Sequence, residues 1–160
     1  MHRIAVVGLL AALAIGIAAP AHADATLFVG ANTTPANRAT RGMAVGVGLL
    51  AFAVEFEYSN TAADATIGAP SLRTGSGNLL LQSPAHFFGF QPYFTLGAGL
   101  FRERLGAHST TSFSPNTGGG VKVSLAGPLQ LRVDYRVFKL GHGALFSPAH
   151  RVYAGLNLKF

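Results

Sequence analysis

The sequence contains no cysteine and no tryptophan, and only 11% of its 160 residues are charged. The absence of cysteine excludes a disulfide framework and any thiolate metal site. Beyond residue 24, no apolar pattern with the helical period of about 3.6 residues is long enough to predict a helix. The formal net charge is +6, but the basic residues are scattered rather than clustered, so we expect no nucleic-acid-binding face.

The N-terminal segment has the three parts of a secretory signal peptide. A short basic stretch precedes an apolar run from Ile4 to Ala19, and Pro20 and an Ala-His-Ala tripeptide follow. The run is shorter than the roughly 20 apolar residues of a membrane-spanning helix, and it ends in a helix breaker and a cleavage motif. We therefore expect a cleaved signal peptide over residues 1–23, with cleavage after Ala23. The exported chain, residues 24–160, is long enough for one domain.

Residues in the remainder of the chain alternate with a period of two. In the last ten, Val152, Ala154, Leu156, Leu158 and Phe160 are apolar, and the residues between them are mostly polar or small. Such alternation predicts an extended strand with one apolar and one polar face. The same pattern predicts eight strands, over residues 25–32, 42–49, 51–59, 76–82, 92–102, 112–125, 129–138 and 151–160.

Short and long connections alternate between the predicted strands. An even strand number with short turns on one side and longer loops on the other is typical of an outer-membrane barrel. We therefore predict an all-β fold, an eight-stranded antiparallel transmembrane up-and-down β-barrel, with both termini on the periplasmic side. The short connections are a turn near residue 50 and the segments 84–90 and 126–128, and the long ones are 33–41, 60–75, 103–111 and 141–150.

The predicted polar faces carry opposite charges on different strands. An eight-stranded barrel has an interior about wide enough for side chains, and small residues such as the glycines of these faces leave room for long ones. A buried charge without a partner costs about 3–5 kcal/mol, so we expect an ion-paired network that plugs the lumen. A minor channel for small solutes is the alternative. The expected network residues are Glu55, Glu57, Lys122, Arg132, Asp134 and Arg136.

A soluble secreted barrel with a hydrophobic ligand inside would show the same alternation, but it would turn the apolar faces inward. The opposite charges on the polar faces argue against that arrangement. Aromatic residues also gather near predicted strand ends, as in the interfacial girdle of a membrane barrel, although the tryptophan of the usual girdle is missing. These aromatics are Phe87, Phe88, Phe90, Phe94 and the C-terminal Phe160.

Three stretches resemble the OmpA-type small outer-membrane β-barrel family. They are PYFTLGAGLFRE, TGGGVKVSLAGPLQLRVDYRVFKLG and RVYAGLNLKF, within residues 92–160, and the first half of the chain matches only in its strand pattern. The residues that carry the resemblance are Pro92, Tyr93, Gly97, Ala98 and Gly99; Gly118, Gly120 and Val121; Leu131, Arg132, Asp134, Tyr135 and Arg136; and Phe160.

The resemblance implies a location and a set of partners. It implies a porin-like barrel of the bacterial outer membrane, surrounded by outer-membrane lipid and lipopolysaccharide, and escorted by periplasmic chaperones. The terminal strand, with Val152, Leu156, Leu158 and Phe160, resembles the signal that the barrel assembly machinery reads. Because many functions share such barrels, the resemblance leaves the role open. We expect a structural or surface-interaction role, and the loops do not identify a ligand.

Two more specific functions, lipid A modification and metal binding, are alternatives to this role. Some eight-stranded barrels of this kind modify lipid A with a Ser, a His and an acidic residue, and this chain has His108-Ser109 and, on a later strand, Asp134. The family's deacylases separate His and Ser by one residue and add a later Glu, whereas here the two are adjacent and no Glu follows Glu103. We therefore expect no enzyme activity and no cofactor.

Four histidines fall in or near connections: His86, His108, His142 and His150. The last three belong to the loop side of the predicted barrel and could meet there. Loop histidines usually face water, however, so we expect no metal site.

Overall fold

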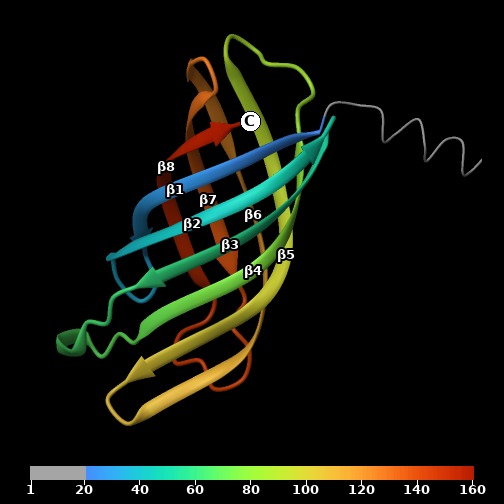
Figure 1. Ribbon diagram of the computed structural model, residues 1–160. Coiled ribbons are helices and arrows are strands. Elements are labelled where there is room, and N and C mark those ends of the chain that lie inside the picture. The colour runs from blue at the N-terminus through green and yellow to red at the C-terminus, as the bar shows by residue number, and fades with distance from the viewer. Residues whose placement is uncertain (1–20) are drawn as a thin grey trace, which may run out of the picture.

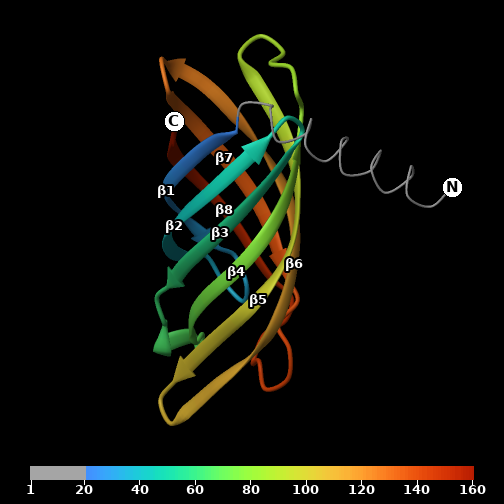
Figure 2. The ribbon, with the colours of Figure 1, turned by 45° about the vertical axis from the view of Figure 1, so that its right-hand side comes forward.

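A computed structural model describes residues 21–160. They form a closed barrel of eight antiparallel strands, each paired with its sequence neighbours, and the first strand pairs with the last (Figures 1 and 2). This confirms the predicted fold. The strands are β1 (His22–Asn32), β2 (Arg38–Leu49), β3 (Phe52–Thr61), β4 (Ser71–Gln82), β5 (Phe90–Leu105), β6 (His108–Ala126), β7 (Leu129–Phe138) and β8 (Ala149–Lys159).

Within residues 21–160 there is a single 3₁₀ turn, η1 (Ala65–Ile67), which lies in the connection between β3 and β4. No helix of these residues is long and apolar enough to cross a bilayer. The predicted signal peptide falls mainly on residues outside those described, so it stays a prediction. Cleavage after Ala23 would remove the first two residues of β1.

The barrel closes through the last strand of the chain. β8 pairs with β1 from Asp24 opposite Lys159 to Asn32 opposite Arg151. Beyond this ladder, the Phe160 N–H donates to the Ala23 carbonyl and the Ala23 N–H donates to the Phe160 carbonyl, both at 2.8 Å. Closure leaves no sheet edge along this seam. A strand in lipid requires such closure, because no water is present to pair with the backbone groups of an open edge.

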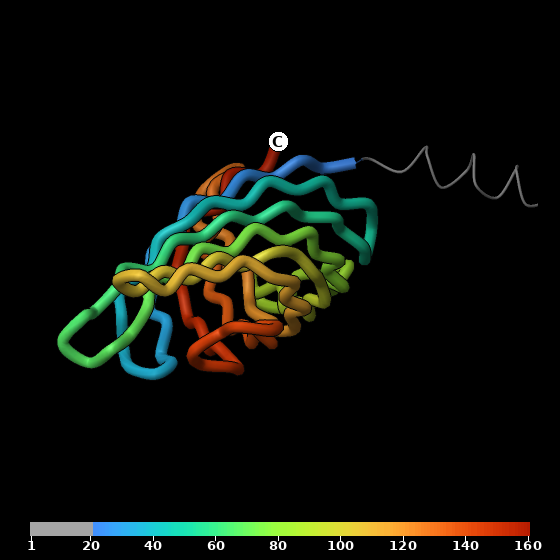
Figure 3. The backbone as a smooth tube through the Cα atoms, turned by 90° about the horizontal axis from the view of Figure 1, so that it is seen from below, coloured from blue at the N-terminus to red at the C-terminus, as the bar shows by residue number. Residues whose placement is uncertain are grey.

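The two ends of the barrel differ in their connections. One end, called the termini end, carries the start of β1, the end of β8 and the connections 50–51, 83–89 and 127–128. The far end carries the connections 33–37, 62–70, 106–107 and 139–148, which Figure 3 shows from below. The hairpin of β5 and β6 reaches furthest at the far end (Figures 1 and 2).

Three predicted loops were too long. The segment 33–41 shrinks to 33–37 because β2 begins at Arg38. The segment 103–111 is a two-residue hairpin turn, with Gly106 at φ 56°, because β5 and β6 continue past the predicted strand ends. The segment 60–75 shrinks to 62–70 because β4 begins at Ser71. Polar residues outside an apolar band give no strand signal by themselves, yet their backbone groups still pair with a neighbouring strand.

The two faces of the sheet are inverted relative to a water-soluble barrel. Large apolar side chains point outward, among them Leu27 and Val29 at 69% exposure and Phe56 at 67%. The charged side chains of the predicted network point inward, and Arg132 and Arg136 are both 0% exposed. The outer surface therefore suits a hydrocarbon surrounding rather than water. The five predicted girdle aromatics are all exposed: Phe87, Phe88, Phe90, Phe94 and Phe160.

Candidate functional site: the luminal charge network

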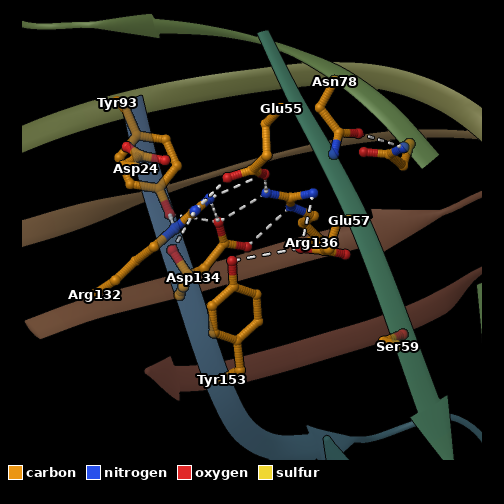
Figure 4. Close-up of polar contacts among 12 residues, drawn as sticks. Asp24, Glu55, Glu57, Ser59, Asn78, Tyr93, Arg132, Asp134, Arg136 and Tyr153 are labelled. Atoms are coloured by element: carbon orange, nitrogen blue, oxygen red, sulfur yellow. Dashed lines mark hydrogen bonds and ion pairs between the residues drawn. The ribbon is translucent and has the colours of Figure 1, made fainter. Parts of the chain in front are cut away.

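Two strands on different sides of the lumen contribute the core of the site. Alternation on β3 turns Glu55 and Glu57 inward, and alternation on β7 turns Arg132, Asp134 and Arg136 inward. Figure 4 shows these five side chains converging between the strands. Each of them is at most 3% exposed. They are five of the six residues that the charge pattern singled out.

The two arginines share the same carboxylates. The Nη1 of Arg132 donates to Glu55, and its Nη2 donates to Asp134 at 3.3 Å (Figure 4). Arg136 donates from Nη2 to Glu55 at 2.9 Å and from Nε to Asp134 at 3.1 Å. Its Nη1 lies 3.1 Å from an oxygen of Glu57. Such multidentate contacts combine charge with several hydrogen bonds and fix the geometry of both groups.

Two tyrosines complete this core. The hydroxyl of Tyr93 accepts from Nε of Arg132 at 2.8 Å and donates to Asp134. The guanidinium of Arg132 also lies over the Tyr93 ring, 4.9 Å from its centroid, in cation–π geometry. The hydroxyl of Tyr153 donates to Glu57 at 3.5 Å. Sequence analysis placed both tyrosines on polar faces but assigned them no part in the network.

Arg151 is a charged network residue that the charge pattern did not single out. It donates from Nη1 to the Ser59 hydroxyl at 2.6 Å and from Nη2 to Glu57. Its guanidinium also lies over the Phe138 ring, 4.6 Å from the centroid. The available signal was its position in the polar series of the last strand. With Arg151 included, three guanidinium groups face three carboxylates, so the buried network is balanced in charge.

Lys122, the sixth residue predicted for the network, lies apart from the other five. Its Nζ donates to Asp24 at 2.5 Å, nearer the termini end, and both side chains are less than one-fifth exposed. Asp134 pairs with Arg132 and Arg136, the two arginines of its own strand, and not with Lys122.

Glycines on β6 leave the space that the long side chains occupy. A Cβ atom on Gly118 would lie 2.9 Å from Cγ of Arg136, and one on Gly120 would lie 2.5 Å from the Tyr93 hydroxyl. Both distances are well inside normal contact, so larger residues would displace the network.

An apolar cluster fills the lumen between the network and the far end. Ala144, in the connection 139–148, packs against this cluster. The Leu145 N–H donates to the buried carboxylate of Glu103 at 2.9 Å, which attaches the same connection to β5. The buried members of the cluster are Leu72, Phe101, Phe138, Leu140 and Ala149.

The residues considered for catalysis do not meet. His108 and Ser109 begin β6, whereas Asp134 lies opposite Gly120, twelve residues further along that strand. Twelve strand residues span about 40 Å, so Asp134 cannot act on the Ser109 hydroxyl. Among residues 21–160 no three or more His, Cys, Asp or Glu side chains are grouped to hold a metal ion. His150 instead contacts the Tyr135 hydroxyl, with its Nδ1 at 2.7 Å.

Comparison with known proteins relates the chain to others by structure only. No protein-family model matches the sequence, and no curated protein matches it. The N-terminal β-barrel domain of Pseudomonas aeruginosa OprF superposes with a TM-score of 0.68 at 10% identity, over 87% of this chain and 97% of that domain. Neisserial surface protein A (NspA) superposes with a TM-score of 0.64 at 17% identity, over 88% and 96%. The outer-membrane enzyme PagL superposes with a TM-score of 0.56 at 12% identity, over 84% and 98%. At these identities the likeness establishes the fold alone, which is that of small outer-membrane barrels.

Proposed function

We propose that this chain is an integral protein of the bacterial outer membrane, an OmpA-type small barrel with a closed lumen. Its role is structural or lies in interactions at the cell surface. The observation that carries the proposal is the inverted barrel, with apolar side chains outside and a charge-balanced network inside. In water this arrangement would expose a large apolar wall, whereas lipid would cover the wall and leave the network charges paired with one another inside.

Two layers in the lumen support a closed barrel rather than a channel. The network joins β3 to β7 across the interior through Glu55, Arg132 and Arg136. The apolar cluster around Phe101 and Phe138 lies between this network and the far end. Opening a path for ions would require breaking several buried charge pairs at a cost of about 3–5 kcal/mol for each charge left unpaired. This free-energy cost disfavours the porin-like alternative, a minor channel.

The proposal also assigns the two ends of the barrel. The start of β1 and the end of β8 lie at one end, which we assign to the periplasm, so the far-end connections face outward beside lipopolysaccharide. The outer face of β8 carries Val152, Leu156 and Leu158, and the exposed Phe160 follows directly after the strand; these are the residues of the expected assembly signal. Periplasmic chaperones and the barrel assembly machinery are the partners that this strand implies. A ligand of the far-end loops is not part of the proposal.

Cell fractionation followed by electrophoresis with and without boiling tests the location and the fold. We expect the protein in the outer-membrane fraction, with a mobility that changes on heating because a closed barrel resists detergent. A soluble protein in the periplasm or medium without a heat shift would overturn the proposal.

Planar-bilayer recording tests the closed lumen. The purified barrel should produce no steady conductance above that of the empty bilayer. Stable unitary currents from the same heat-modifiable protein would replace the structural role with the channel.

The proposal includes no catalytic role, because Asp134 lies far from the adjacent His108 and Ser109. PagL is described as an enzyme, and the shared fold does not transfer that description to this chain. Mass spectra of lipid A from cells with and without the protein check this point. A lipid A species that depends on the protein would contradict it.

A further inference from the structure

Four neighbouring strands carry a row of polar side chains on the outer wall of the barrel. Arg41 on β2 lies opposite Asn60 on β3, Asn60 lies opposite Arg73 on β4, and Arg73 lies opposite Arg102 on β5. The three arginines are exposed. Because neighbouring strands lie about 4.8 Å apart, the row is about 14 Å wide. We call these four residues the arginine row.

The arginine row marks the point where the apolar wall stops. On each strand, the next outward residue toward the termini end has no charge. The exposed fraction is 54% for Met43 on β2, 46% for Tyr58 on β3 and 59% for Leu100 on β5. In a membrane barrel this boundary is the level of lipid headgroups.

No carboxylate of the described residues neutralises the row. None of the ion pairs within residues 21–160 includes Arg41, Arg73 or Arg102. The carboxylates of the strands point inward, and Asp64, in a far-end loop, accepts from the amide and hydroxyl of Thr66 at 3.0 and 2.5 Å. These hydrogen bonds lower the pKa of Asp64.

Arg73 and Arg102 lie directly opposite one another, and such like charges on adjacent strands repel. An anion between them would turn this repulsion into attraction. Guanidinium groups bind phosphate with paired, charge-assisted hydrogen bonds.

An apolar groove begins at the arginine row and runs toward the middle of the wall. The part of the groove beside the row, about 320 Å³, is lined by Arg41 and Asn60 and by Met43 and Tyr58. Met43 and Tyr58 also line the part nearer the middle of the barrel, about 420 Å³, which continues past Phe56. Gly75 and Gly77 lie along this part and place no side chain in it. The groove is therefore a shallow apolar depression in the outer wall, with the positive charge of Arg41 at one end.

A larger groove over β1, β7 and β8 lacks this combination. It measures about 660 Å³ and is lined by apolar residues and glycine, with no charged side chain. Nothing in the structure indicates its occupant, so it serves only as a comparison.

We propose that the arginine row and the adjoining groove bind one phosphorylated lipid of the outer leaflet, the lipid A part of lipopolysaccharide. Its phosphates contact Arg41, Arg73 and Arg102, and one acyl chain lies in the groove along Gly75. The width of the row exceeds what one phosphate requires and suits a lipid that carries two. This inference rests on the proposed membrane location. It adds to that proposal the residues that contact lipid and the chemical class of the lipid.

Native mass spectrometry of the detergent-purified barrel, titrated with lipid A that carries two phosphates, tests the proposal. The triple variant Arg41→Gln/Arg73→Gln/Arg102→Gln should bind roughly tenfold more weakly, because each exposed charge pair contributes a few-fold. Lys139→Gln is the matched control, since Lys139 is an exposed basic residue on another part of the barrel. Lipid A stripped of its phosphates should bind wild type and triple variant equally weakly.

The groove is tested separately from the charges. A Cβ on Gly75 meets no atom within 4 Å, so Gly75→Leu fills the groove without disturbing the barrel. It should weaken lipid A binding several-fold, whereas Ala154→Leu in the comparison groove should leave binding unchanged. Equal lipid A binding by wild type, triple variant and Gly75→Leu would overturn the proposal. Displacement of lipid A by equimolar inorganic pyrophosphate would also overturn it, because the groove would then contribute nothing.

A heat-shift gel of each purified variant separates this inference from the proposed function. If the wild-type barrel comes from the outer membrane and is heat-modifiable but does not select lipid A, only the lipid site is refuted. If the wild-type chain is soluble and shows no heat shift, both the proposed function and the lipid site are refuted.

Discussion

Arg132 on β7 and Glu55 on β3 form an ion pair across the lumen, between strands that are not neighbours in the sheet. The pair is fully enclosed, and both partners have further contacts, Arg132 with Asp134 and Glu55 with Arg136. It therefore couples two walls of the barrel that backbone hydrogen bonds connect only through the intervening strands. The stability of the closed barrel should depend strongly on it.

Replacing Arg132 by Ala should destabilise the barrel by about 3–5 kcal/mol, because Glu55 and Asp134 would lose a buried partner. Urea unfolding in detergent, followed by the heat-shift gel, measures the loss. Arg102→Ala is the control, since an exposed side chain without an ion pair should change the free energy of unfolding by about 0.5 kcal/mol or less. An Arg132→Ala barrel as stable as wild type would refute the structural network.

Truncation of Phe101 to Ala should cost about 3–5 kcal/mol, because the ring is 1% exposed and its removal opens a cavity in the apolar cluster. Phe56 provides the matched comparison, since its ring is 67% exposed on the outer wall and leaves no cavity. Unfolding midpoints of the two variants at equal detergent concentration measure the difference. Equal midpoints would show that the cluster around Phe101 is not a packed core.

Enlargement of Gly120 to Ala should destabilise the barrel by about 1–3 kcal/mol, because the new methyl group would overlap the Tyr93 hydroxyl and the Val133 carbonyl. Gly75→Ala should be neutral, since its Cβ reaches open space. The folded fraction after refolding into detergent, read from the heat-shifted band, compares the two. Efficient refolding of Gly120→Ala would mean that the network has room to move.

Substitution of Phe160 by Ala should reduce assembly in cells far more than stability in detergent. The side chain is 69% exposed, and the backbone pair with Ala23 does not depend on it. We expect the free energy of unfolding of the refolded variant to fall by no more than about 1 kcal/mol. The amount in the outer membrane, measured by immunoblot at equal expression, should fall several-fold. Normal amounts there would show that the terminal aromatic is not part of an assembly signal.

The sequence alone determined the strand number, the facing of most side chains and the inward position of the network charges. These features follow from covalent geometry, because successive side chains of a strand point to opposite faces whatever the strand pairs with. The outward Phe56 and the inward Glu55 and Arg132 were therefore predictable from local order. The hairpin turn at Gly106 was not, since only the pairing of β5 with β6 shows how far each strand continues.

Which charges meet was decided by the tertiary structure. Arg151 joins Glu57 and Lys122 joins Asp24, because barrel closure sets the register of every strand and thereby the level of each inward side chain. The arginine row has the same origin, since Arg41, Arg73 and Arg102 are far apart in sequence and become neighbours only through strand register. Alternation assigns a residue to a face, but contact across a lumen or along a wall depends on pairings between distant segments, and no local pattern in the sequence contains them.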